Sequence, residues 1–301
     1  MSINETNIDL LWSNLFGSVL SLGGLTGNSL VILTFWRHRS LRQEDGLQLI
    51  ALLAVTDLFF CTSAFFTGTF RLTRYHLLAY TRFTRLECML VPYPNMLAVY
   101  QSHFVTAVMA KNRHSATVNP LRLVDLPMIK IVTCMILFSL FGATPIFFGV
   151  DLHSRPPACT AIGSAHRIVA VYCTVLYCSL TLIVVAFYLR IVFLLHTAKY
   201  KVSHVVSSVI QKARIARQKR LTKTSVTIIS VHIVSFFLPM FTMFVLSVVG
   251  VSQQMRGRLA PFAGVGQLIN ANLNVLVYAG KSSLIRPYLV ATLKGTKYLK
   301  Q

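Results

Sequence analysis

Long apolar stretches alternate with short polar segments along this chain of 301 residues. Seven of the stretches are about 20 residues or longer, which is enough for an α-helix to cross roughly 30 Å of hydrocarbon. The pattern predicts an all-α membrane protein, a single bundle of seven transmembrane helices over residues 1–301. The predicted spans are residues 10–36, 47–70, 89–110, 131–150, 168–189, 224–251 and 259–280.

Charge is scarce and unevenly placed, which supports a membrane protein and orients it. Hydrophobic residues make up 54% of the chain and charged residues only 12%. Most of the 29 basic residues lie in the segments on one side of the predicted spans, and eight lie on the other side. The positive-inside rule therefore predicts an N-terminus outside the cell and a cytosolic tail. The net charge of +21 is thus explained by the topology of a multi-pass plasma-membrane protein. Nucleic acid is therefore not an expected partner.

Three features of the predicted outer face follow from this topology. The glycosylation sequon at Asn4 lies outside. No cleavable signal peptide is visible, so we expect the first span to act as an uncleaved anchor. Cys88 and Cys159 are the two cysteines at the oxidising face, and they are the candidate disulfide, with two unpaired thiols as the alternative.

Several polar side chains lie inside the predicted spans, where they are costly. An aspartate at a membrane helix centre costs on the order of 2.5–3.5 kcal/mol, so Asp57 requires a partner or a function. Ser102, Asn270 and Asn274 are its candidate partners, and the simpler alternative is a protonated Asp57 satisfied by neighbouring amides. Asn28 also needs partners on neighbouring helices.

The third span has landmarks at characteristic spacing. Cys88 lies at one predicted membrane face, Arg113 follows 25 residues later, and Pro120-Leu121 follows seven residues after that. This arrangement resembles the third helix of rhodopsin-like G-protein-coupled receptors. Asn112 and His114 stand where that family usually has Asp and Tyr.

The resemblance covers almost the whole chain, with defined departures. It includes Asn28 of the first helix, the Leu-Ala-Val-Thr-Asp run that ends at Asp57, and the Asn-rich stretch that ends at Tyr278. The fourth helix lacks the usual tryptophan. Other positions depart from the family pattern as well, namely Leu180 and Val275, which replace prolines, and Phe237, which replaces a tryptophan.

The resemblance implies roles for individual residues. It implies a polar switch with an allosteric sodium ion at Asp57, G-protein coupling at the cytosolic end, a hinge in the sixth helix and a ligand pocket in the outer half. No other metal or cofactor is implied. The switch residues are Asn28, Asp57, Ser102, Asn270, Asn274 and Tyr278; the coupling residues are Arg113, Leu121 and Tyr188; the hinge is Phe237 and Pro239; the pocket residues are Asn95, Phe237, Phe241 and Gln267.

The charges on the predicted outer half narrow the range of possible ligands. Asn95 stands where amine receptors of the family carry an aspartate, so a biogenic amine is not expected. The basic first outer loop would attract an acidic ligand or peptide, although such charges often only meet solvent or lipid headgroups. Within the family the chain most resembles invertebrate FMRFamide-type peptide receptors and nematode rhodopsin-like chemoreceptors. We therefore expect a neuropeptide, with a small chemosensory molecule as the alternative.

Other local patterns predict structure and regulation. Pro92 and Pro94 should bend the outer third helix. A short surface helix is expected at residues 282–294. The basic segment 199–223 fits either anionic lipid or a G-protein contact. Asn112 and Lys219 occupy positions where acids usually restrain the arginine, so the resemblance implies raised basal activity.

The sequence also bears on three alternatives to a signalling receptor. An enzyme is not expected, because no nucleophile–base pair, metal-spaced histidine cluster or phosphate-binding loop is present. An ion-coupled transporter or channel is the alternative from another class, since Asp57 and several amides could form an ion path, but no internal repeat is visible. A receptor-shaped protein that has lost signalling is the third alternative, given Asn112, Phe237 and Val275.

Overall fold

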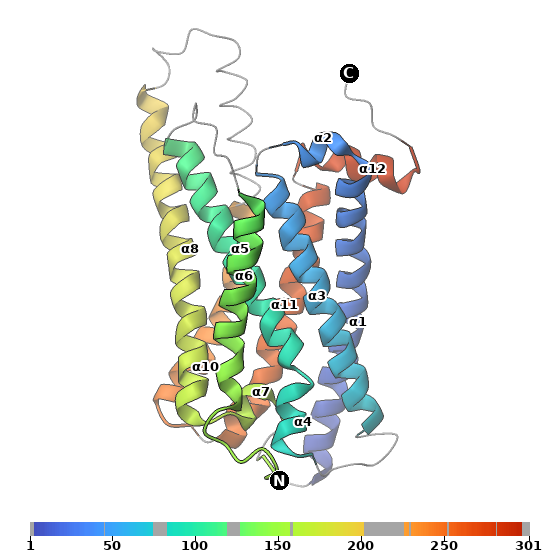
Figure 1. The fold of residues 1–301 in the computed structure, drawn as a ribbon, viewed down its shortest axis with the longest axis vertical. Helices are drawn as coiled ribbons and strands as arrows, with labels where there is room; N and C mark the ends of the chain where they lie inside the picture. Colours follow the sequence, from blue (N-terminus) through green and yellow to red (C-terminus); the bar gives the residue numbers. More distant parts are fainter. Residues whose placement is uncertain are drawn as a thin grey trace.

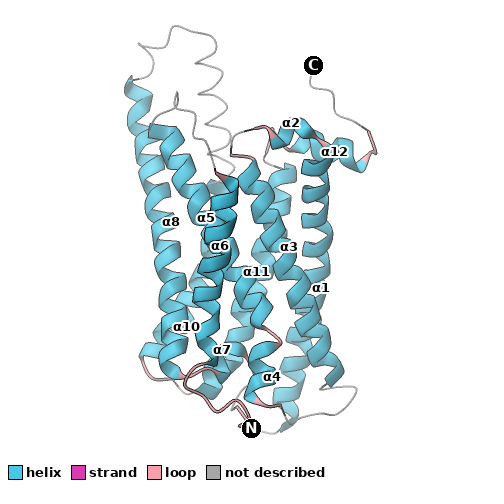
Figure 2. Cartoon of the chain, viewed as in Figure 1, coloured by secondary structure: helices cyan, strands magenta, loops and turns pink. Residues whose placement is uncertain are grey.

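The protein is a bundle of long, roughly parallel helices, seen in a computed structural model (Figure 1). The structure describes residues 3–44, 46–74, 83–118, 127–156, 159–201, 226–228, 230–251, 253–280 and 282–296. Every regular element in this part of the chain is helical (Figure 2). The predicted all-α seven-helix fold is therefore confirmed.

Seven long helical segments form the bundle within the described residues. Some segments are interrupted by a turn or a change of helix type. They are α1 (Ile3–Arg37), α3 (Gln48–Leu72), α4 (Arg85–Leu90) with α5 (Tyr93–Val118), α6 (Met128–Ala143) with η2 (Thr144–Phe147), α8 (Arg167–Lys201), residues 226–228 and 230–232 with η3 (Ile233–Phe237) and α10 (Leu238–Val248), and α11 (Gln253–Gly280). Short helices connect or extend them, namely α2 (Arg39–Arg42), α7 (Ala161–Ser164) and α12 (Arg286–Leu293).

The two ends of the bundle differ. The short helices α2 and α12 lie at the end near the C-terminus, and α4 and α7 lie at the end near the N-terminus (Figure 1). We call these the α12 end and the disulfide end, because Cys88 and Cys159 are bonded at the second one. The predicted disulfide is thus present in the structure. Asn4 lies in the first turn of α1, and its glycosylation remains a prediction.

The outer surface of the bundle is apolar, as lipid requires. Trp36, Ile129, Phe141 and Leu189 are each more than 60% exposed. Cys134 on α6 is also exposed. Such broad apolar exposure would be unfavourable in water, so this chain is a multi-pass membrane protein.

Five of the described helices are long and apolar enough to cross a membrane by composition, and α5 and α11 are not among them. Both helices carry buried polar residues on their inward faces. On α5 these include Ser102 and His103, and on α11 they include Gln267, Asn270 and Asn274. Their lower hydropathy therefore reflects a central position, where neighbouring helices cover the polar groups.

The third transmembrane segment is broken near its disulfide end. α4 ends at Leu90, a turn covers Val91 and Pro92, and α5 begins at Tyr93. A capping box starts α4: the Glu87 amide donates to Thr84 Oγ1 at 3.3 Å, and the Thr84 amide donates to the Glu87 carboxylate at 2.9 Å. The irregularity predicted from the prolines of this segment is confirmed.

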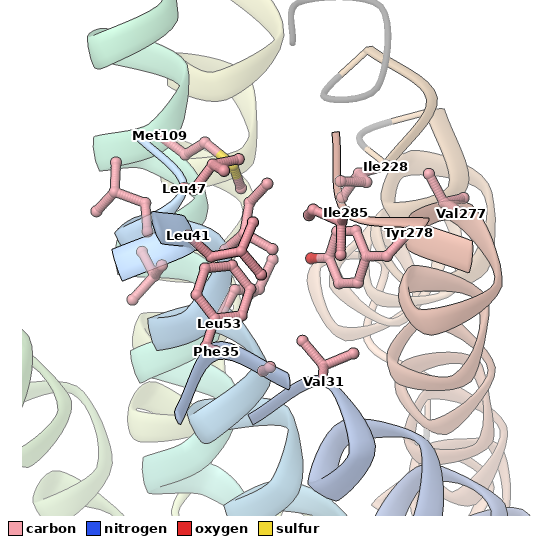
Figure 3. Packing of buried hydrophobic residues seen from close by; sticks show 14 of the residues in the cluster. Val31, Phe35, Leu41, Leu47, Leu53, Met109, Ile228, Val277, Tyr278 and Ile285 are labelled. Carbon is pink, nitrogen blue, oxygen red and sulfur yellow. The ribbon is translucent and has the colours of Figure 1, made fainter. Parts of the chain in front are cut away.

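A buried apolar cluster of the described residues lies toward the α12 end and includes Tyr278 (Figure 3). Figure 3 shows Leu47, Leu53 and Met109 facing Tyr278 and Ile285 across the cluster. Side chains of α1, α3, α5, α11 and α12 all contribute to it. The cluster therefore fixes the ends of these helices relative to one another.

Helix α12 is docked on the corner between α1 and α2. His38 and Tyr288 make an edge-to-face ring contact with centroids 5.1 Å apart. The His38 Nε2 atom lies 3.3 Å from Thr292 Oγ1, and Arg37 donates to the Gly295 carbonyl. Tyr288, Leu289, Ala291 and Thr292 are buried, whereas Leu293 is exposed. One face of α12 thus packs on the bundle and the other is apolar and open.

Candidate functional site

A buried carboxylate links three helices at the centre of the bundle. Ser102 Oγ of α5 donates to Asp57 Oδ1 of α3 at 3.2 Å, and Asn274 Nδ2 of α11 donates to Asp57 Oδ2 at 2.9 Å. All three residues are at most 1% exposed. Each carboxylate oxygen therefore accepts from a different helix, so the contact joins α3, α5 and α11 at one point.

Buried amide oxygens on α11 and α1 retain unused acceptor capacity within the described residues. Asn270 lies one helical turn before Asn274 on α11, and the side-chain oxygens of both have no hydrogen-bond partner within the described residues. Asn28 of α1 donates to the Gly24 carbonyl at 2.9 Å, and its Oδ1 is likewise unpartnered. Carboxylate, hydroxyl and amide oxygens are the donors that hard cations prefer. The residues at Asp57 therefore fit a small cation such as sodium.

Asn272, the remaining asparagine in this part of α11, has a structural role in helix packing. Asn272 Nδ2 donates to the Leu20 carbonyl of α1 at 3.0 Å. A Cβ at Gly23 or Gly24 would fall against the Asn272 side chain or Cys61, so these glycines allow α1 to approach closely. Asn272 thus holds α1 against α11 and is separate from the Asp57 contact.

Arg113 is anchored to the first loop of the α12 end. Its Nη2 donates to the main-chain carbonyl of Gly46 at 2.9 Å, and its side chain is only 2% exposed. Gly46 has φ +77°, and a Cβ there would overlap the guanidinium. The neighbouring Asn112 is also buried. Leu121, a predicted coupling residue, lies outside the described residues, as does Lys219, which stands where the family usually has a restraining acid.

Two tyrosines with predicted roles are buried near this end. Tyr278 of α11 is 1% exposed, and its hydroxyl has no partner among the described residues. Tyr188 of α8 packs with Ala110, Val184 and Ile191. α11 runs without interruption from Gln253 to Gly280, in keeping with Val275 where the family usually has proline.

The sixth helix changes type at the predicted hinge. A π-helical turn, η3, covers Ile233–Phe237 and precedes α10, in which Pro239 is near the start. Pro239 has no amide hydrogen, so it leaves the Ser235 carbonyl four residues earlier without its helical donor. That carbonyl faces Gly266 of α11, where a Cβ would lie 1.8 Å from the oxygen.

A cavity of about 210 Å³ lies between the helices toward the disulfide end. Asn95 and Gln267, two of the predicted pocket residues, line it. Phe237 and Phe241 are not among its described lining residues, and Phe241 is 44% exposed. Met240 lines the cavity instead. The π-turn adds a residue before α10 and rotates the following side chains relative to a regular helix.

Sequence reasoning missed a buried aromatic cluster beside this cavity. His103 of α5 and His232 of the sixth helix have ring centroids 4.7 Å apart, and His103 also contacts Tyr177 of α8 at 5.5 Å. Tyr100 stacks on Tyr177 at 4.3 Å. The histidines are scattered along the chain and give no motif, so only the packing of the three helices brings these rings together.

The fold and the site define a seven-helix membrane receptor. Comparison with solved structures finds squid rhodopsin, with a TM-score of 0.73 at 17% sequence identity, covering 96% of this chain and 86% of that one. No curated protein matches the chain. The family model described as 7 transmembrane receptor (rhodopsin family) matches residues 27–278.

The chain belongs to the rhodopsin family of seven-transmembrane receptors. It is therefore a G-protein-coupled receptor and not an enzyme. This membership implies an extracellular ligand and a G-protein partner.

Proposed function

We propose that the chain is a plasma-membrane neuropeptide receptor whose disulfide end faces outward and whose α12 end faces the cytosol. The distribution of basic residues supports this orientation, since most of them flank the α12 end. The acidic side chain that would pair with an amine ligand is replaced by Asn95, which lines the cavity. A basic outer surface favours ligands with acidic groups.

A chemosensory role for small molecules is the second candidate. The observation that favours it is the cavity volume of about 210 Å³. Pockets for drug-sized ligands are typically about 300–1,000 Å³, so this cavity holds a smaller molecule or only one end of a peptide. Both candidates use the same site and the same signalling path.

The observation that carries the proposal is the contact of Asp57 with Ser102 and Asn274. It joins three helices that line the cavity, α3, α5 and α11, and the last two also carry Arg113 and Tyr278 toward the α12 end. A ligand shifts the equilibrium only by binding the active arrangement more tightly. In our proposal, the sixth helix then swings about Pro239 and opens the α12 end to the G protein.

The proposal also includes an allosteric sodium ion at Asp57. The Asp57 carboxylate would hold the ion together with Ser102 and the amide oxygens of α11. The bound cation would supply charge neutralisation for the buried carboxylate. The unpartnered oxygens of Asn270 and Asn274 support this part of the proposal.

Two measurements on the same vesicles distinguish a signalling receptor from an ion transporter or channel. The full-length protein is purified into proteoliposomes, and nucleotide exchange on added G proteins is measured with pools of acidic and amidated peptides. Ion flux is measured in the same vesicles. Peptide-dependent exchange without flux is the expected result. Flux that depends on Asp57, without any exchange, would contradict the receptor proposal and favour a transporter or channel.

A further inference from the structure

Among the described residues that line the cavity, Arg71 is the one with a charged side chain. Arg71 lies in the last turn of α3, where a cation is favoured by the helix dipole. The rest of the lining is apolar or neutral and includes Phe60, Met96, Met240 and Leu268. The electrostatic potential of this wall is therefore suited to an anionic group.

Two amides in the lining have hydrogen-bonding capacity that no described residue satisfies. Gln267 is 0% exposed, and both its Nε2 and its Oε1 are without partners in the part of the chain that the structure describes. Asn95 uses its Nδ2 to donate to Thr67 Oγ1 at 3.3 Å, and its Oδ1 is unpartnered. A buried amide with unmade hydrogen bonds is costly, about 1–3 kcal/mol for each such group. A ligand that supplies both a donor and an acceptor would remove this cost.

The charged and polar parts of the wall are close together. Thr67 and Arg71 are four residues apart on α3 and therefore share a face, with one turn of about 5.4 Å between them. Asn95 is bonded to Thr67. Asn95 thus meets α3 about one helical turn from Arg71, and Gln267 lines the cavity from α11.

The volume limits what the cavity can hold. An apolar cavity of about 150 Å³ accommodates benzene. The 210 Å³ available here is larger, which leaves room for one apolar side chain together with an amide.

We infer that this cavity binds an N-acyl amino acid unit, with its carboxylate at Arg71, its amide at Asn95 and Gln267, and its side chain against the apolar lining. The amide N–H can donate to Asn95 Oδ1, and the amide carbonyl can accept from Gln267 Nε2. Arg71 matches a carboxylate through its planar array of donors. This inference rests on the proposed function, because it takes the cavity as the receptor's ligand site.

Two kinds of ligand contain an N-acyl amino acid unit with a free carboxylate. One is the free C-terminal residue of a peptide, and the other is a small acylated amino acid. Matched pairs of compounds test the shared chemistry and distinguish the sources. The pairs are N-acetyl-leucine and its amide, N-acetyl-phenylalanine and its amide, and pentapeptides ending in Leu or Phe as free acids or amides.

Binding is measured as the shift in melting temperature of the purified full chain in detergent, without a G protein. The free acids are expected to raise the melting temperature and to bind at least about tenfold more tightly than their amides. Pentapeptide acids that bind more tightly than the acetylated residues would identify a peptide source. The reverse order would identify a small-molecule source.

Variants locate the contact. Arg71→Gln should bring the affinity of the acid down to that of the amide, and Arg71→Lys should retain part of the preference. Arg74→Gln is the matched control, because Arg74 pairs with Glu87 at 3.6 Å, is not among the cavity-lining residues and carries the same charge one turn further on. Gln267→Leu should weaken the binding of the free acid and of the amide to the same extent.

The inference is overturned if no free acid shifts the wild-type melting temperature, or if acid and amide bind equally well. It is also overturned if Arg74→Gln removes the preference for the acid as strongly as Arg71→Gln. These results leave the receptor proposal standing, since nucleotide exchange driven by another peptide would still support it. Binding of the acids without any exchange would support the inference and count against the receptor proposal.

Discussion

The main-chain carbonyl of Ser235 in η3 faces the backbone of Gly266 in α11 so closely that a Cβ at Gly266 would lie 1.8 Å from the oxygen. The contact is between two backbones, so a flexible side chain cannot move aside to relieve it. The same carbonyl lacks its helical donor because residue 239 is proline. The π-helical turn of the sixth helix, at the predicted hinge, is thus packed directly against α11.

Gly266→Ala is expected to destabilise the protein strongly. The added methyl group requires the two helices to separate, and overpacking of this kind costs about 1–3 kcal/mol. The measurement is the melting temperature of the purified protein. Gly280→Ala on the same helix is the control, because a Cβ there meets nothing within 4 Å. Equal melting temperatures for the two variants would contradict the close approach.

Sodium is expected to stabilise the protein through Asp57. At a sodium concentration ten times the dissociation constant, binding to the native state alone adds about 1.4 kcal/mol. Replacing choline chloride with sodium chloride should therefore raise the melting temperature of the wild type. Asp57→Asn should abolish the increase, and Asp151→Asn in an exposed loop should retain it. An identical sodium response in both variants would exclude Asp57 as the site.

Basal signalling is expected to exceed the background of mock-transfected cells. Arg113 is held by a neutral carbonyl at Gly46, and the adjacent position is Asn112 instead of an acid. A hydrogen bond to a charged group contributes about 1.5–3 kcal/mol. Asn112→Asp should therefore lower basal nucleotide exchange about tenfold, and Asn112→Ala should not. Wild-type basal exchange equal to background would refute the expectation.

Stability is expected to decrease in mild acid through His38. Burial lowers the pKa of His38 below 6.5, and the positive charge of Arg37 lowers it further. The unfolded chain therefore binds a proton near pH 6.5 that the native state does not bind, so stability rises with pH across this window. The melting temperature should fall from pH 7.5 to pH 5.5, and His38→Gln should reduce the decrease. An unchanged pH slope in the variant would exclude this histidine.

The apolar pattern alone was enough to predict the helices and their number. Buried polar residues such as Asp57 and Asn274 could also be anticipated, because their cost in a membrane requires partners. The break in the third segment could be predicted from Pro92 and Pro94, because a proline restricts the backbone locally. These features depend on the properties of individual residues or short stretches.

Features that depend on rotation about a helix axis could not be predicted in this way. Phe241 was expected in the cavity, but the π-turn before Pro239 places Met240 there. Cys134 lies in an apolar span like the buried cysteines, yet its face of α6 is open. The ring contact of His103 with His232 joins residues that are distant in sequence, and neither carries a recognisable local motif.

The acceptor for Arg113 is a main-chain carbonyl, and every amino acid carries one. Position 46 contributes only its backbone, and any Cβ there would overlap the guanidinium, so this restraint is encoded in a glycine and the path of the loop and not in a matched pair of side chains. Searches for co-varying positions would therefore overlook it. Receptors that lack the familiar acidic partner could retain an arginine lock through loop geometry alone.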